Sequence, residues 1–115
     1  MADLILHIAK RTAWEEARAT GTYAPASLAA DGFIHFSDVD QVVRVANLGF
    51  PGVGDLVLLC VLADRLSAPL RYEAGDGDDE RFPHLYGTLN LDAVIDVVAF
   101  PGTRDGFVLP SISRP

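Results

Sequence analysis

The feature that most restricts the fold is an uninterrupted apolar segment at residues 56–63, Leu-Val-Leu-Leu-Cys-Val-Leu-Ala. The segment is far shorter than the roughly 18 residues that a membrane span requires. It is also too uniform for a strand that exposes one face to water, because such a strand alternates apolar and polar residues. We therefore expect it to form a central strand of a sheet that is covered on both faces.

Two short helices are predicted in the first half of the chain. Thr12 and, three residues later, Glu15 form a capping box, which predicts a helix that ends at Gly21. Ser37 or Asp38 caps the second helix, whose apolar residues recur at intervals of three and four positions. This spacing predicts one buried face, formed by Val39, Val42, Val43, Ala46 and Phe50.

The rest of the chain predicts mostly strands. With helices early, strands late and no sustained βαβ alternation, the pattern predicts one α+β domain over residues 1–115, with a mixed or antiparallel sheet. The remaining elements are strands at residues 4–9, 33–36, 70–73 and 94–100, single helical turns at residues 28–30 and 91–93 capped by Ser27 and Asn90, and a hairpin at residues 101–106 that leads to a strand at residues 107–109.

Charge and composition narrow the function classes. The net charge is −7, and the nine lysine and arginine residues form no run or helical stripe, which argues against nucleic-acid binding. Neither a secretory signal nor a membrane-spanning segment is evident, so we expect a cytoplasmic protein that binds a small molecule and no membrane. The single cysteine, Cys60, lies within the apolar segment, where burial keeps a thiol unreactive.

Each of the three histidines, His7, His35 and His84, lies inside a short apolar segment. Imidazole titrates near neutrality and can donate, accept or bind a metal, so the three rings together suggest a shared pocket. The plainer interpretation is that each ring is buried and bonded to a backbone partner. Side-chain alternation puts His7 with Ala9 and His35 with Ser37 on one strand face, so we expect His7 and His35 to point into a common cleft.

Residues 82–87 are expected to form another wall of this cleft. Pro83 and Gly87 flank His84 and Tyr86 and restrict their placement. The acidic, glycine-containing residues 74–81 precede them, and we expect a mobile flap there. Binding of a metal by the histidines is a third interpretation, but gaps of 28 and 49 residues give no local ligand motif, so no metal site is predicted.

The sequence resembles a known bacterial family through two motifs. These are Gly-Phe-Ile-His-Phe-Ser at residues 32–37 and Phe-Pro-His-Leu-Tyr-Gly at residues 82–87, preceded by Leu-His-Ile at residues 6–8. On these motifs the chain is identified as a member of the family of domain of unknown function 952. The resemblance implies a fold similar to that of the ADP-ribosyltransferases, in which a split α+β sheet binds NAD in a cleft.

The same resemblance implies roles for individual residues. His7 is similar to the histidine that bonds a ribose hydroxyl in transferases of the His-Tyr-Glu kind, and His35 stands where an aromatic residue stacks on nicotinamide. Glu73 is similar to the catalytic glutamate, with Glu80 as a second candidate. The residues expected to act are Glu73 and His35 in catalysis and His7, His35, Ser37, His84 and Tyr86 in binding NAD.

Two functions are consistent with these residues. One is an NAD-using transferase or glycohydrolase, in which the Glu73 carboxylate stabilises the positive charge that develops when an N-glycosidic bond breaks. The alternative is a noncatalytic nucleotide or metabolite binder, because the sequence supplies no clear nucleophile. Plainer roles also stay open, with Glu73 in a surface salt bridge and Tyr23 and Tyr86 as packing aromatics.

Overall fold

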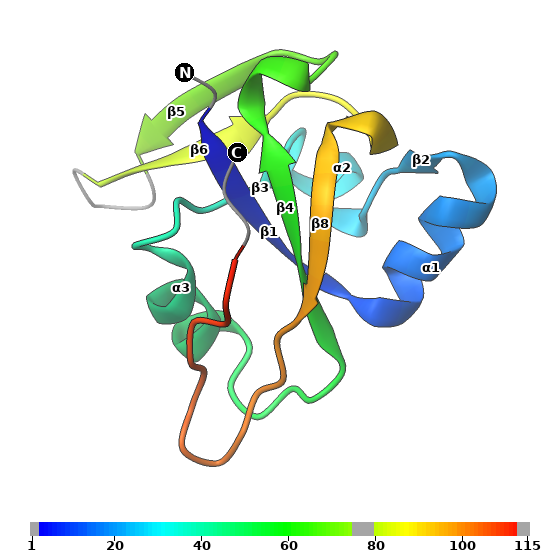
Figure 1. The fold of residues 1–115 in the computed structure, drawn as a ribbon. Helices are drawn as coiled ribbons and strands as arrows, with labels where there is room; N and C mark the ends of the chain where they lie inside the picture. Colours follow the sequence, from blue (N-terminus) through cyan, green and yellow to red (C-terminus); the bar gives the residue numbers. More distant parts are fainter. Residues whose placement is uncertain (1–2, 75–79, 113–115) are drawn as a thin grey trace.

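The structure, a computed structural model, describes residues 3–74 and 80–112 and has an α+β architecture with antiparallel sheets (Figure 1), as predicted. Two sheets have three strands each, in the orders β1-β4-β8 and β3-β6-β5, and the third pairs β2 with β7. The elements in chain order are β1 (Leu4–Lys10), α1 (Arg11–Thr20), β2 (Thr22–Tyr23), α2 (Ala26–Asp31), β3 (Ile34–His35), α3 (Val42–Gly49), β4 (Leu56–Leu62), the 3-10 helix η1 (Ala63–Arg65), β5 (Leu70–Ala74), β6 (Arg81–Leu85), β7 (Leu89–Asn90), the 3-10 helix η2 (Leu91–Ala93) and β8 (Val94–Ala99).

Strand β4 is the central strand predicted from the apolar segment. All of its residues are buried, and it pairs with β1 on one side and β8 on the other. Leu59 belongs to the core cluster that includes Ala17 of α1, whereas Cys60 belongs to the cluster that includes Val42 of α3. The two helices therefore cover opposite faces of the sheet. Burial also raises the pKa of the Cys60 thiol to about 11, which agrees with an unreactive cysteine.

The backbone after β3 joins the two larger sheets. Ser37 and Leu6 exchange two hydrogen bonds of 2.8 Å, from each N–H to the carbonyl oxygen of the other residue. One residue earlier, the Phe36 N–H donates to the carbonyl oxygen of Pro83 at 2.9 Å. The chain thus passes from β6 to β1 within two residues, which places β3, β6 and β5 beside the first sheet.

Helix α1 forms where predicted, but the capping box at Thr12 and Glu15 is wrong. The N-cap lies two residues earlier, at Lys10, which makes no side-chain cap, and the helix begins at Arg11. Arg11 explains the difference: its N–H donates to the carbonyl oxygen of Asp55 at 3.0 Å, and its Nε donates to the Asp55 carboxylate at 2.8 Å. A contact distant in sequence therefore sets the start of this helix, and its end at Gly21 is as predicted.

The other helix starts are also displaced from their predicted caps. Helix α2 begins after Pro25, not after Ser27, and spans six residues. Helix α3 begins at Val42, because the Gln41 side chain accepts a hydrogen bond of 2.9 Å from the Asp38 N–H and holds a turn before the helix. The predicted apolar face of α3 is confirmed, since all five of its residues pack in the second core cluster.

Two predictions for the second half of the chain are wrong. Residues 107–109 form no strand: β8 ends at Ala99, and the Phe107 ring packs 4.7 Å from that of Phe100. Asn90 does not cap η2 but bridges to the loop after η1, accepting from the Ser67 N–H and donating to the Arg65 carbonyl, each at 2.9 Å. None of the helices within the described ranges has the length and apolar character needed to span a membrane.

Candidate functional site

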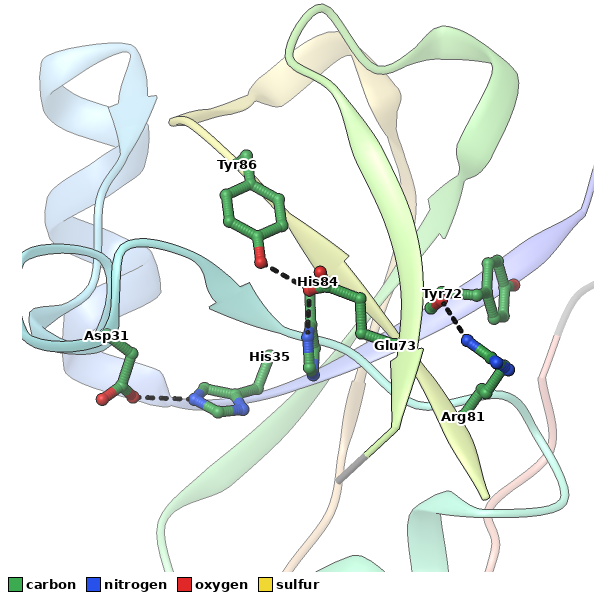
Figure 2. Close-up of polar contacts among 7 residues, drawn as sticks. All are labelled: Asp31, His35, Tyr72, Glu73, Arg81, His84 and Tyr86. Atoms are coloured by element: carbon green, nitrogen blue, oxygen red, sulfur yellow. Dashed lines mark hydrogen bonds and ion pairs between the residues drawn. The ribbon is translucent and has the colours of Figure 1, made fainter. Parts of the chain in front are cut away.

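The outer side of the β3-β6-β5 sheet carries most of the residues singled out in the sequence. His84 lies directly opposite His35 on one neighbouring strand and opposite Arg71 on the other, so the three side chains point to the same side. Residues two positions along each strand share that side. We call it the histidine face, formed by Phe33, His35, Arg71, Glu73, His84 and Tyr86, four of which Figure 2 shows.

Glu73 holds two neighbours of this face through one of its oxygens. Its Oε1 accepts from His84 Nδ1–H at 2.9 Å and from the Tyr86 hydroxyl at 2.5 Å (Figure 2). These two bonds, the one from Tyr86 first, lower the pKa of the Glu73 carboxyl, so it is ionised at neutral pH. The same contact with Glu73 raises the pKa of Tyr86, which stays protonated and keeps donating.

The second Glu73 oxygen, Oε2, and the second His84 nitrogen, Nε2, have no partner among the described residues. His84 is a buried residue, with 10% of its side chain exposed, whereas 36% of the Glu73 side chain is exposed. Since the carboxylate can only accept, Nδ1 of His84 carries a proton in this pair.

His35 forms a second histidine–carboxylate pair. Its Nε2 lies 2.9 Å from Oδ2 of Asp31, so Nε2 carries a proton that it donates to the carboxylate. Asp31 is the last residue of α2, and Gly32, with a φ of 85°, turns the chain back into β3 so that the two side chains meet. Asp31 was not predicted as a site residue, although its spacing of four residues before His35 was visible in the sequence.

One aromatic ring contacts the rings of His35, His84 and Tyr86. Phe33 stacks on His84 with a centroid distance of 4.0 Å, and its centroid lies 4.7 Å from that of His35 and 5.4 Å from that of Tyr86. The two imidazoles are 5.5 Å apart, edge to face. Phe33 therefore fixes the spacing of the rings. Phe33 was not predicted as a site residue, although its position two residues before His35 placed it on the same strand face.

His7 lies in the core and not on the histidine face. Its Nδ1–H donates to the carbonyl oxygen of His35 at 2.6 Å, and its Nε2 accepts from the Tyr23 hydroxyl at 2.8 Å. Burial lowers the pKa of His7 to about 4, so the ring is neutral. The structure does not bring the His7 and His35 rings together. The two residues lie on β1 and β3, which belong to different sheets, and alternation along one strand does not say how its faces are placed relative to those of a strand in another sheet.

The Tyr23 hydroxyl gives a direct test of this buried pair. Tyr23→Phe removes the donor and leaves Nε2 of His7 buried without a partner, so we expect a loss of about 1–2 kcal/mol in the free energy of unfolding. Urea unfolding at pH 7 measures it. Tyr72→Phe is the matched control, because the Tyr72 hydroxyl bonds to Asp38 at an exposed position. An equal loss in both variants would contradict the role of Tyr23.

Two other predicted residues lie apart from the face. Ser37 is buried, and its backbone groups bond to Leu6 where the sheets join. Glu80 faces α3, where its carboxylate accepts from Gln41 Nε2 at 3.1 Å and pairs with Arg44. The expected flap falls largely on residues 75–79, which lie outside the described residues.

Two hollows of the surface lie away from the histidine face. One of about 350 Å³ lies between α1 and β8, beside Trp14 and Asp96, and one of about 450 Å³ lies beside Asn47 and Phe107. Within the described ranges, no three histidine, cysteine, aspartate or glutamate side chains are placed to hold a metal ion together. The chemistry available to the face is therefore that of imidazole, carboxylate, phenol and guanidinium groups.

Comparisons with known proteins identify relatives of the same fold. The family described as protein of unknown function (DUF952) matches residues 8–97. No curated protein matches the chain. The crystal structure of protein CC0527 from Caulobacter crescentus is 39% identical, with a TM-score of 0.81 over 90% of this chain and 91% of that chain. The solution NMR structure of the same protein, also 39% identical, has a TM-score of 0.78 over 90% of each chain.

Proposed function

The chain belongs to the DUF952 family, and we propose that its histidine face is the active site of an enzyme that breaks the N-glycosidic bond of a nicotinamide nucleotide such as NAD. One observation carries the proposal. The Glu73 carboxylate is held through Oε1 by His84 and Tyr86, its other oxygen bonds to no described residue, and it shares the face with His35, whose ring is bonded to a second carboxylate. Such a fixed negative charge suits a reaction that develops positive charge.

In the proposed reaction, the bond between C1′ of the ribose and the nicotinamide nitrogen breaks. The electron pair leaves with nicotinamide, which needs no proton, and positive charge develops at C1′. Oε2 of Glu73 stabilises that charge, as carboxylates do in glycoside cleavage. Water or an acceptor hydroxyl then bonds to C1′ and gives its proton to Nδ1 of His35. Hydrolysis and transfer to an acceptor differ only in this last partner.

The proposal retains part of the similarity to the ADP-ribosyltransferases. Two three-stranded antiparallel sheets lie side by side, and the glutamate lies on a strand late in the chain. His35, His84 and Tyr86 are proposed to bind the nucleotide. His7 has no binding role in this proposal, because both of its ring nitrogens are already bonded in the core. Instead it supports His35 through the carbonyl oxygen of that residue.

A noncatalytic nucleotide binder is the second candidate, favoured by the exposure of the His35 and Glu73 side chains, which is 55% and 36%. Enzymes that generate a glycosyl cation usually enclose it and exclude water. A binder needs only the aromatic and charged groups, without Glu73 in a chemical role. The two candidates therefore differ in one measurable property, which is whether removal of the Glu73 charge changes turnover or only affinity.

The proposal predicts that Glu73→Gln lowers nicotinamide release from NAD at least about 100-fold while it changes NAD affinity less than tenfold, since the charge acts mainly in the transition state. Nicotinamide release is followed by chromatography and affinity by calorimetry. Glu16→Gln on the exposed side of α1 is the matched control and is expected to retain full turnover.

Two results would contradict the enzyme proposal. Binding of NAD without nicotinamide release by the unmodified protein would support the binder instead. Absence of both binding and release at millimolar NAD would remove nicotinamide nucleotides as ligands of the face. Unfolding curves of Glu73→Gln and Glu16→Gln check that neither change acts through stability.

A further inference from the structure

We propose that Arg71 binds a phosphate group of the ligand, so that the histidine face selects phosphorylated ribosyl compounds over the corresponding nucleosides. The inference rests on the proposed function for the identity of the ligand. Its basis is the placement of Arg71 on β5, directly opposite His84 and on the same side of the sheet.

Arg71 is an available cation on this face. Its side chain is exposed, and no carboxylate in the described ranges lies within ion-pair distance of it. Its guanidinium lies over the Tyr86 ring, 5.2 Å from the centroid, which orients the group without using its donors. The Glu73 carboxylate on the same face lies beyond ion-pair distance of this guanidinium, and its Oε1 already accepts from His84 and Tyr86. A guanidinium with unused donors is well suited to bind phosphate.

The order of groups across the sheet sets the orientation of the ligand. Arg71, His84 and His35 occupy one row on three adjacent strands, so the ends of the row are separated by two strand spacings, or about 10 Å. A phosphate at Arg71 then leaves the sugar over His84 and Glu73, and the base toward Phe33 and His35. This arrangement places C1′ next to the carboxylate that the proposed reaction requires.

The other arginine of this hairpin provides a matched control. Arg81 lies on β6 opposite Ala74 and directly before Phe82. Because successive side chains of a strand alternate, it points to the other side of the sheet from Phe82 and His84. It is exposed like Arg71, and its guanidinium donates to the Tyr72 carbonyl at 3.4 Å, as Figure 2 shows. Arg71→Gln and Arg81→Gln therefore remove the same charge from opposite sides of one strand pair.

The experiment compares nicotinamide mononucleotide with nicotinamide riboside, and AMP with adenosine, by calorimetry and by NMR signals of the histidine rings. In the unmodified protein, each phosphorylated compound is expected to bind at least about tenfold more tightly than its nucleoside. Arg71→Gln should abolish that difference and leave nucleoside affinity within twofold. Arg81→Gln should preserve the difference.

Failure of this inference is distinguishable from failure of the proposed function. If Arg71→Gln and Arg81→Gln retain the same preference for phosphate, Arg71 is not the phosphate-binding residue, whatever the effect of Glu73→Gln on turnover. Equal affinities of AMP and adenosine for the unmodified protein would also overturn it. A preference that depends on Arg71, in a protein that releases no nicotinamide, would support the phosphate site and reject the enzyme.

Discussion

Lowering the pH from 7 to 4 is expected to reduce the free energy of unfolding by about 3 kcal/mol through His7 alone. The pKa of this histidine falls from 6.5 to about 4 on folding, because the buried ring is desolvated. A shift of that size corresponds to about 3 kcal/mol at 1.36 kcal/mol per pKa unit. Between these two pKa values the unfolded chain binds a proton that the folded chain does not, so stability falls as the pH falls.

Urea unfolding at pH 7, 6, 5 and 4 measures this loss. The effect of His7 begins near pH 6.5 and is complete near pH 4. Glu73, whose pKa is lowered by Tyr86 and His84, adds a loss that begins only as the pH falls below its unfolded value of 4.5. The interval from pH 6.5 to 5 therefore isolates His7. His7→Gln should be less stable at pH 7 but lose less stability over this interval, whereas equal losses in both proteins would contradict the assignment.

Predictions that rest on the residues of one continuous segment agree best with the structure. The apolar residues of β4 required cover on both faces, and the structure supplies it with α1 and α3. The apolar face of α3 followed from spacing within one helix. Helix starts were less predictable, because the contact of Arg11 with Asp55 joins positions far apart in the chain. A capping box contributes about 1 kcal/mol, which such a contact can outweigh.

The site was predicted in its residue types but not in its arrangement. His35, Glu73, His84 and Tyr86 lie on one sheet face, and this depends on the register in which β3 and β5 pair with β6. Sequence periodicity places residues on a face of one strand, and only the register relates the faces of neighbouring strands. For the same reason the roles of Asp31, Phe33 and Arg71 became visible only in the structure, and His7 was assigned to the wrong group of side chains.

Gly87→Ala is expected to destabilise the fold by about 3 kcal/mol or more, because two penalties coincide at this position. An added Cβ would lie 2.6 Å from Cβ of Ala68, and the backbone has a φ of 155°, which disfavours side chains. The preceding residue, Tyr86, donates its N–H to the carbonyl oxygen of Pro69 at 2.8 Å. The collision would therefore separate the segments that hold the Tyr86 ring beside Glu73.

Two further variants separate these penalties. Ala68→Gly removes the Cβ that an alanine at position 87 would meet. The double variant with Gly87→Ala should therefore be at least about 1 kcal/mol more stable than the sum of the two single effects predicts. Gly21 has a φ of 90° and open space around an added Cβ, so Gly21→Ala measures the penalty of the backbone conformation alone. We expect it to lower the free energy of unfolding by about 1 kcal/mol. Urea unfolding of Gly87→Ala, Ala68→Gly, the double variant and Gly21→Ala measures these differences. If Gly87→Ala costs no more than Gly21→Ala, the close approach of residues 68 and 87 does not hold the Tyr86 side of the histidine face.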